Sequence, residues 1–356
     1  MDSEVGAGRH EIDRVDAEIV RLLNERARIA QRIGAAKTAE ARLTYAPERE
    51  RDVLERVRSQ GRDGPLRPAH LLSIYRQIIS ACRALERPLE VAYFGPAATF
   101  THQAALERFG EATRLVPLAS IPEVFEETQR GHADFGVVPV ENSTEGSVHL
   151  TLDTFVESEL KVCSEIVLPI SLQLVARGRM EDIATVYSNP VALAQCRQWI
   201  ARHLPGCSIV DAASTARAAV MAAEDPTGAA IAPELAAAEY GLDIVARDIQ
   251  DIASNYTRFY VIGPALAGEP TGRDKTAIVF SIRDRVGALR DVADVFARRG
   301  VNMSTIQSRP SRRRAWDYIF FVEFEGHERD PLVEGALQEL TGQCAFLKVI
   351  GSWPVD

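Results

Sequence analysis

Residues 9–37 read RHEIDRVDAEIVRLLNERARIAQRIGAAK, and their spacing sets the architecture of the first part of the chain. Aliphatic residues from Ile12 to Ile33 recur at intervals of three, four or sums of these, with no proline between them. This pattern predicts one long amphipathic helix. Two more helical patterns follow at residues 49–58 and 69–86, separated by the breaker stretch GRDGPLRP. We therefore expect residues 1–88 to form an all-helical domain.

Three cations, Arg9, Arg26 and Lys37, lie on or beside the apolar stripe of this first helix. Because an unpaired charge on apolar surface is costly, a bound anion is their simplest partner. Arg9 and Lys37 also lie near the helix ends, where they could instead reach water. At about 1.5 Å per residue, Arg9 and Arg26 are roughly 25 Å apart, too far for one small molecule to touch both in one chain. An interlocked helical homodimer would bring them to a shared site and cover the stripe.

The pattern of apolar and polar residues changes after residue 88. Short apolar runs such as VAYFG and DFGVVPV alternate with helical patterns over residues 89–265, which predicts an α/β domain. The stretches ADFGVVPVEN and GAAIAPELAA share an order of residue types and suggest two similar lobes. After the Gly- and Pro-containing ALAGEPTGRD, residues 274–356 follow the order strand, helix, strand, strand, helix, strand. That order predicts an α+β ferredoxin-like domain.

Composition narrows the class of protein. With 46% hydrophobic and 26% charged residues the chain is of the globular type, and no uncharged apolar run approaches the roughly 18 residues of a membrane span. Five scattered cysteines without a CxxC pair indicate reduced thiols and a cytoplasmic location. The seven histidines show no metal-ligand spacing, so we expect no metal. The net charge of −9 disfavours nucleic acid as a partner.

The quoted helix, followed by PERERDVLERV and YRQIISACRALE, resembles the all-helical class of chorismate mutase over nearly all of residues 8–87. In that family the helices of two subunits enclose chorismate, and a pericyclic rearrangement gives prephenate without a nucleophile. Glu86 takes the position that faces the ether oxygen, where it must be protonated to donate; a solvated glutamate at the helix end is the alternative. The residues that the resemblance implies are Arg26, Lys37 and Glu86 as catalytic groups and Arg9 of the other subunit, Arg49, Glu50 and Cys82 as substrate contacts.

Three stretches of the middle segment, GPAATFTHQAA, VVPVENSTEGSV and IASNYTRFYVIG, resemble the signatures of prephenate dehydratase over about residues 91–263. The resemblance implies a two-lobed, periplasmic-binding-protein-like fold that eliminates carbon dioxide and the ring hydroxyl from prephenate, with no cofactor. Thr257 is the expected donor to the leaving hydroxyl. Arg258 is either a substrate contact or a structural ion pair, and polar residues at the turns also fit ordinary helix caps. The substrate-binding residues implied are Thr99, Glu141, Asn142, Ser143, Ser188, Arg258 and Phe259.

The C-terminal stretch DRVGALRDVADVFARRGVNMSTIQSRP resembles the ligand-binding part of ACT domains that follow prephenate dehydratases. There, L-phenylalanine binds at a dimer interface and inhibits the enzyme. From the residues alone, the same stretch is a tight turn before a helix and an exposed strand end. Gln307 replaces a glutamate of the family, which leaves the strength of feedback open. The regulatory residues implied are Gly287, Ala288, Leu289, Gln307, Ser308, Arg309 and Pro310.

The three resemblances occur in the order expected of a bifunctional chorismate mutase and prephenate dehydratase with a regulatory domain. This interpretation divides the chain into residues 1–88, 89–265 and 274–356. It implies chorismate and prephenate as substrates, L-phenylalanine as effector, and a homodimer or a tetramer. Two alternatives remain: a dehydratase whose helical domain only dimerises, and a non-catalytic binding protein that responds to an amino acid.

Overall fold

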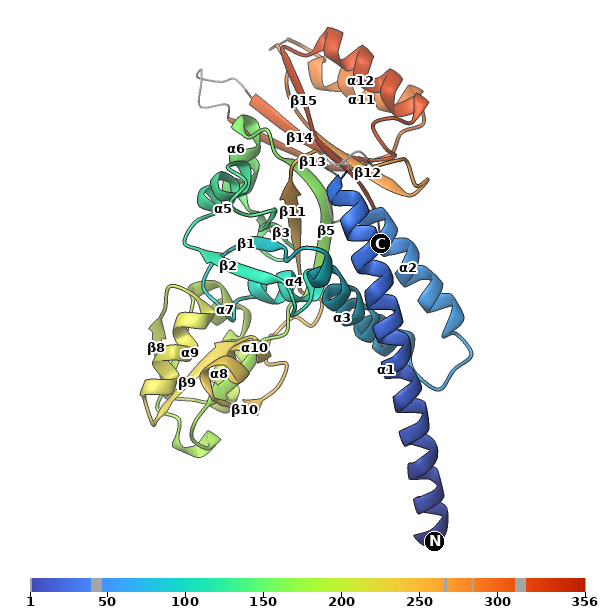
Figure 1. The fold of residues 1–356 in the computed structure, drawn as a ribbon. Helices are drawn as coiled ribbons and strands as arrows, with labels where there is room; N and C mark the ends of the chain where they lie inside the picture. The colour runs from blue at the N-terminus through green and yellow to red at the C-terminus, as the bar shows by residue number, and fades with distance from the viewer. Residues whose placement is uncertain (1, 40–46, 266–267, 284, 311–317, 356) are drawn as a thin grey trace. The chain divides into compact units, whose positions relative to one another are not determined.

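The computed structural model describes residues 2–39, 47–265, 268–283, 285–310 and 318–355, apart from the side chains of residues 2–4 and 37–39 (Figure 1). The contacts within the chain divide it into two compact units. The first consists of Met1–Glu90 and Glu107–Arg114, and the second of Val91–Leu106 and Leu115–Asp356. The second unit thus contains most of the predicted middle domain together with the predicted C-terminal domain.

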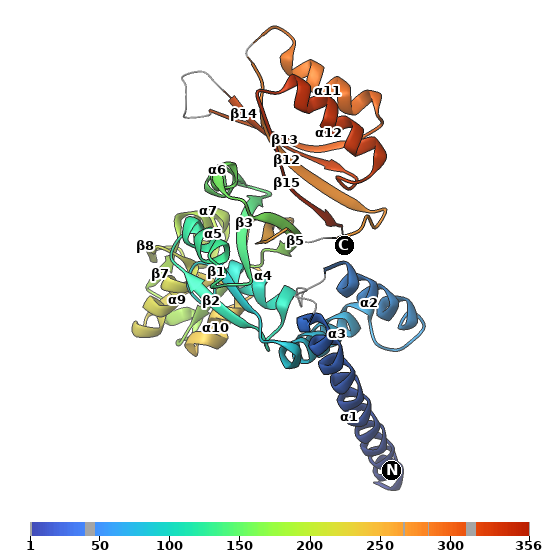
Figure 2. The same ribbon diagram turned by 45° about the horizontal axis from the view of Figure 1, so that its top comes forward.

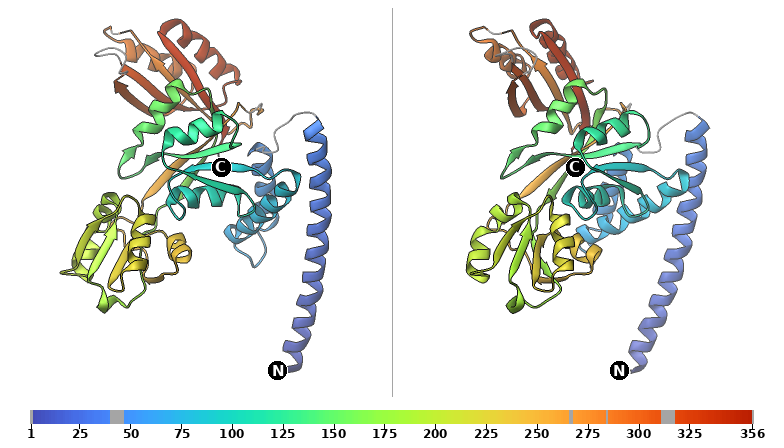
Figure 3. Two further views of the ribbon diagram at one scale, coloured as in Figure 1. Left: turned by 60° about the vertical axis from the view of Figure 1, so that its left-hand side comes forward. Right: turned by 90° about the vertical axis from the view of Figure 1, so that its left-hand side faces the viewer.

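Three helices build most of the first unit: α1 (Asp2–Ala39), α2 (Pro47–Gln60) and α3 (Pro68–Glu86). Both α1 and α2 pack on α3, which confirms the predicted all-helical domain. Figures 1 and 3 show α1 as one uninterrupted helix. Pro68 begins α3, where its missing amide hydrogen leaves no intrahelical bond unmade.

The apolar stripe of α1 is exposed in the single chain. Ile12 is 61% exposed, Ile19 48% and Ile29 42%. A long stripe of this kind normally packs against another helix. The expected homodimer stays a prediction, and the exposed stripe is the surface that it would cover.

The first lobe of the second unit is built on a mixed sheet with the strand order β2-β1-β3-β11-β5, and β4 pairs with β3. Strand β11 is antiparallel to both of its neighbours, β3 and β5, although it follows them by more than eighty residues. The elements of this lobe are β1 (Glu90–Phe94), α4 (Phe100–Phe109), β2 (Arg114–Leu118), α5 (Ile121–Gln129), β3 (Phe135–Asn142), β4 (Gly146–Ser147), α6 (His149–Glu157), β5 (Lys161–Pro169) and β11 (Tyr256–Gly263).

The second lobe lies between β5 and β11 in the sequence, so the chain crosses between the lobes twice (Figure 3). Its sheet has the order β10-β6-β9-β7-β8. Two sheets joined by two crossings confirm the predicted two-lobed α/β fold. The elements are β6 (Gln173–Ala176), the 3-10 helix η1 (Met180–Asp182), β7 (Thr185–Ser188), α7 (Pro190–Gln195), α8 (Arg197–His203), β8 (Ser208–Asp211), α9 (Thr215–Glu224), β9 (Gly228–Ala232), α10 (Glu234–Tyr240) and β10 (Asp243–Ala246).

The C-terminal segment forms the predicted βαββαβ unit with an antiparallel sheet of order β13-β14-β12-β15. Figure 2 shows α11 and α12 together on one face of this sheet. Its elements are β12 (Asp274–Ser281), α11 (Ala288–Arg298), β13 (Met303–Pro310), β14 (Tyr318–Glu325), α12 (Pro331–Gln343) and β15 (Phe346–Pro354).

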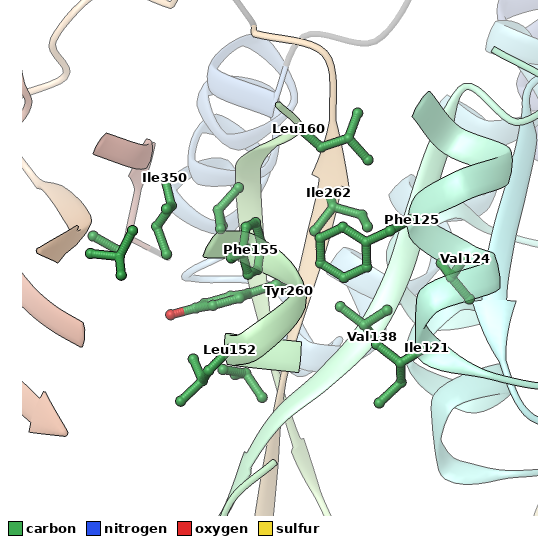
Figure 4. Close-up of a cluster of buried hydrophobic side chains, with 14 of the residues drawn as sticks. Ile121, Val124, Phe125, Val138, Leu152, Phe155, Leu160, Tyr260, Ile262 and Ile350 are labelled. Carbon is green, nitrogen blue, oxygen red and sulfur yellow. The ribbon is translucent and has the colours of Figure 1, made fainter. Parts of the chain in front are cut away.

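The other face of the C-terminal sheet packs on the first lobe. Ile350 belongs to the same apolar cluster as Phe155 and Tyr260 of the first lobe (Figure 4). The fully buried Trp353 is part of the same cluster. The rings of Tyr260 and Trp353 meet edge to face with centroids 5.4 Å apart. The C-terminal sheet and the first lobe therefore share one core.

No helix among the described residues is both long and apolar enough to span a bilayer. Nor do the described His, Cys, Asp and Glu side chains form a group of three that could hold a metal ion.

Candidate active sites

A pocket of about 410 Å³ lies among the three helices of the first unit. It unites five of the residues that the sequence predicts for the mutase site, although they come from three different helices. Basic and acidic groups alternate around it with isoleucine and valine side chains. The lining residues are Arg26, Ile29, Ala30 and Ile33 of α1, Arg49, Glu50 and Val53 of α2, and Ile79, Cys82, Arg83 and Glu86 of α3.

Two predicted mutase residues are not in this pocket. Arg9 lies exposed on α1 and does not line it. Lys37 belongs to α1, but its side chain lies outside the part that the structure describes. The prediction for each of them stays open.

Arg83 is a pocket residue that sequence reasoning missed. Its Nη1 lies 3.2 Å from Oε2 of Glu50, and both side chains are at most 7% exposed. Its Nη2 donates to the carbonyl oxygen of Phe109 at 2.7 Å. In the sequence, the position of Arg83 next to Cys82 on a mostly apolar helix could have indicated that it lies in the pocket. The pair balances the charge of Glu50. The other charged residues of the lining are Arg26, Arg49 and Glu86.

Gly34 allows α1 to approach α3 beside Glu86. A Cβ atom built on Gly34 would lie 2.7 Å from the Cβ of Glu86, closer than side-chain atoms pack. The close approach brings the Glu86 backbone against α1, and Glu86 is one of the residues that line the pocket.

The second site centres on Thr257 of β11. The register of β11 with β3 sets Thr257 opposite Asn142, and Asn142 Nδ2 donates to Thr257 Oγ1 at 2.8 Å. Asn142 Nδ2 also lies 3.0 Å from Oδ1 of Asn255, and the backbone amide of Tyr256 donates to Ser143 Oγ. The structure thus unites Asn142, Ser143 and Thr257, as predicted.

Three further polar residues, Thr144, Gln195 and Asn255, extend this network into the second lobe. Gln195, at the end of α7, accepts from Asn255 Nδ2 at 3.1 Å and donates to Thr144 Oγ1 at 3.1 Å. Thr144 in turn donates to Asn142 Oδ1 at 2.6 Å. Thr144 and Asn255 lie inside the stretches VVPVENSTEGSV and IASNYTRFYVIG, so the resemblance to prephenate dehydratase could have indicated them. Gln195 therefore links the second lobe to the strand pair that carries Thr257.

Other predicted dehydratase residues lie apart from this network. Ser188 is fully buried and donates to the Ile231 carbonyl. Thr99 accepts from the His102 amide in the first turn of α4. Phe259 is 1% exposed and belongs to the core. These contacts stabilise the fold around the three residues, and the predicted substrate contacts of Thr99, Ser188 and Phe259 stay predictions.

Arg258 lies on the opposite face of β11 from Thr257, since side chains alternate along a strand. It pairs with Glu141, Glu165 and Glu323. Burial is the largest single influence and would lower the pKa of Arg258, but the hydrogen bonds to Glu323 and the charge interactions with Tyr260, Glu323 and Glu165 together raise it. Burial likewise favours a neutral Glu323, yet Arg258 holds the pKa of Glu323 below its ordinary value. Of the two interpretations of Arg258, the structure favours the ion pair.

The predicted regulatory residues divide between two faces of the C-terminal sheet. Gly287 has a φ of 82° at the cap of α11, a conformation that favours glycine; Ala288 behind it is buried, and Leu289 is 40% exposed. On β13, Ser308 pairs with Phe320, which packs on the helix side. Arg309 faces the first lobe and donates to Asp153 of α6 at 3.3 Å.

The two remaining predicted regulatory residues, Gln307 and Pro310, also lie on β13, where side chains alternate between the two faces of the sheet. Gln307 pairs with Phe321, part of the core shared with the first lobe. Pro310 ends β13 and is exposed. The turn at Gly287 and the side chain of Ser308 therefore share the helix side of the sheet, whereas Gln307 and Arg309 do not.

Comparison with known proteins gives three family matches along the chain: chorismate mutase type II over residues 8–87, prephenate dehydratase over 91–266, and the ACT domain over 276–342. A bifunctional chorismate mutase/prephenate dehydratase of Aquifex aeolicus is 49% identical, covering 97% of this chain and 96% of its own. The protein of the same description from Pseudomonas aeruginosa is 41% identical, covering 99% and 98%.

Among solved structures, the prephenate dehydratase of Arthrobacter aurescens in complex with L-Phe matches with a TM-score of 0.70 and 37% identity. The match covers 75% of this chain and 90% of that one. The full-length relatives extend it to the helical unit. The chain therefore belongs to the family of bifunctional chorismate mutase/prephenate dehydratases.

Proposed function

We propose that this chain rearranges chorismate to prephenate in the helical pocket and converts prephenate to phenylpyruvate at Thr257, two steps of L-phenylalanine biosynthesis. The convergence of predicted residues carries the proposal: five of them, from three helices, line one pocket. Neither step changes the net oxidation state of the substrate, so neither needs a redox cofactor.

In the mutase pocket, Arg26 and Arg49 bind the carboxylates of chorismate in the compact conformer that reacts. A protonated Glu86 donates to the ether oxygen, whose bond to carbon breaks as the new carbon–carbon bond forms. Lys37 of the same subunit and Arg9 of a second subunit supply the remaining positive charges around the substrate. The exposed stripe of α1 supports the homodimer that this requires.

At the dehydratase site, Thr257 assists the departure of the ring hydroxyl. Because Thr257 Oγ1 accepts from Asn142, its own proton is directed elsewhere, toward the substrate. The bond to the ring carboxylate breaks, its electrons enter the ring, and the hydroxyl leaves as water after gaining a proton. Aromatisation supplies the driving force, and Ser143, Thr144 and Gln195 hold the geometry.

The C-terminal domain is the proposed sensor of L-phenylalanine, with the Gly287 turn and the adjacent Ser308 at its core. Effector binding at an interface between two such domains would lower dehydratase activity and favour a homodimer or tetramer. A cytoplasmic location fits the five cysteines, all of which are free thiols.

The test supplies purified protein with chorismate alone and follows chorismate loss and phenylpyruvate formation together, with and without L-phenylalanine. A parallel assay supplies prephenate alone. Phenylpyruvate that appears from chorismate and is suppressed by L-phenylalanine supports all three assignments. Prephenate accumulation would reject the dehydratase assignment. No loss of chorismate, with prephenate still turned over, would identify the helical domain as a dimerisation element only. No turnover of either substrate would favour the non-catalytic binding protein.

A further inference from the structure

Neighbouring residues of β11 face opposite sides of its sheet. Thr257 faces Asn142 and the polar network, whereas Arg258 faces the C-terminal sheet. The two side chains share one stretch of backbone, so a force on Arg258 acts directly on the position of Thr257.

Arg258 is held by carboxylates from three strands. Its Nε lies 3.2 Å from Glu141 of β3, and its Nη1 lies 3.5 Å from Glu165 of β5. Those two strands are the neighbours of β11 in its own sheet. The two-pronged contact comes instead from Glu323 of β14, at 2.5 and 2.8 Å. A bidentate pair of this kind fixes geometry as well as charge.

Glu323 has further partners in the same buried cluster. Tyr260 Oη donates to it, and Lys275 Nζ lies 3.7 Å away while it binds Glu165 at 2.7 Å. The side chain of Glu323 is 7% exposed and that of Arg258 18%. Because both are largely removed from water, the loss of one charge leaves the other poorly compensated.

The pairing of β3 with β11 is irregular at this place. Arg258 lies opposite Glu141, but the next residue, Phe259, lies opposite Pro139, so Val140 has no partner residue on β11. Such a bulge interrupts the backbone ladder. The backbone amide of Ser143 donates to the Tyr256 carbonyl at 2.8 Å on the far side of this pair. Beside the bulge the alignment of Asn142 with Thr257 is supported in addition by side-chain contacts, and Arg258 makes one of them with Glu141.

We propose that Glu323 of the C-terminal sheet is a positioning residue for the dehydratase reaction, because it holds Arg258 and so keeps Thr257 aligned with Asn142. The proposal rests on the proposed role of Thr257. It also names a route for regulation: β14 pairs with β13, where Thr305 lies opposite Glu323 and Ser304 Oγ donates to the Glu323 carbonyl at 3.3 Å. An effector that moves β13 would thereby move Glu323.

The main variant is Glu323→Gln in the full chain, which keeps the shape and removes the charge. We expect the dehydratase kcat to fall about tenfold or more, with KM for prephenate within about twofold of wild type. Glu323→Asp, which restores the charge, should recover part of the rate. The matched control is Glu325→Gln: Glu325 is exposed on the same strand, and its carboxylate accepts from Asn302 Nδ2 at 2.9 Å.

Mutase kinetics and Tm of the same proteins separate positioning from folding. Chorismate turnover should be unchanged in Glu323→Gln, and inhibition by L-phenylalanine should be weakened. The double variant Arg258→Gln with Glu323→Gln should be no slower than the slower single variant, because the pair acts as a unit.

Three results would overturn the inference. One is a Glu323→Gln enzyme with the kcat and L-phenylalanine response of Glu325→Gln. Another is a double variant whose losses multiply, and the third is an equal fall of both activities with a lower Tm. Thr257→Ala keeps the two proposals distinct: if that variant still turns over prephenate, the role of Thr257 fails. An inactive Thr257→Ala beside a fully active Glu323→Gln overturns the Glu323 role alone.

Discussion

The side-chain amide of Asn142 donates to the hydroxyl of Thr257 over 2.8 Å, although the two residues are 115 positions apart in the sequence. The antiparallel pairing of β3 with β11 produces this contact. Its direction matters for chemistry, because a hydroxyl that accepts from an amide keeps its own proton for another acceptor.

Replacement of Asn142 tests that direction. Asn142→Asp substitutes an acceptor for the donor, so the Thr257 proton would turn toward the carboxylate and away from the substrate. We expect dehydratase kcat to fall about a hundredfold or more in Asn142→Asp and less in Asn142→Ala, where water can replace the amide. Steady-state kinetics with prephenate measure both, with chorismate turnover as the internal control. Equal losses in the two variants would contradict the proposed direction of the hydrogen bond.

The buried pair of Arg83 and Glu50 should support both the stability and the activity of the helical unit. Arg83→Met leaves a carboxylate buried without its ion-pair partner, a change that typically costs about 3–5 kcal/mol. We expect a lower free energy of unfolding, by denaturant titration, together with weaker chorismate turnover. Arg58→Met is the matched control, since Arg58 and its partner Glu55 are 57% and 66% exposed. An unfolding curve for Arg83→Met that superimposes on that of Arg58→Met would rule out a stabilising pair.

The proposed donor role of Glu86 predicts a pH dependence of mutase activity. Only the protonated carboxyl can donate to the ether oxygen, so chorismate turnover should fall as pH rises. In Glu86→Gln the amide donates at every pH, and the decline should vanish. The measurement is kcat/KM for chorismate across pH in both proteins. Profiles of the same shape would exclude Glu86 as the titrating donor.

The proposed sharing of the mutase site between subunits predicts complementation. Arg9→Ala and Arg26→Ala should each be inactive as mutases. If Arg9 acts in the other subunit, mixed dimers contain one intact site, and re-equilibrated mixtures should recover up to about a quarter of wild-type activity. Sedimentation at micromolar concentration checks that dimers form. A purely monomeric wild-type protein, or a mixture without recovered activity, would contradict the shared site.

Much of this molecule follows from patterns that are local in the chain. The helices α1 and α3 follow from three-and-four spacing, and the C-terminal βαββαβ order follows from alternation of apolar runs. These signals are local because helix and strand periods depend on residues a few positions apart. For the same reason Asn142 and Thr257 could be singled out inside short contiguous stretches.

Partners that are distant in the sequence could not be found in this way. Arg83 is 33 positions from Glu50, Gln195 is 60 from Asn255, and Arg258 is 65 from Glu323. A charged or amide side chain has the same signature in the sequence whether it is solvated or paired. Folding separates the two cases, because burial makes an unpaired polar group costly and selects its partner. That is why the packing of β11 against the C-terminal sheet was needed to show that Arg258 is held by Glu323.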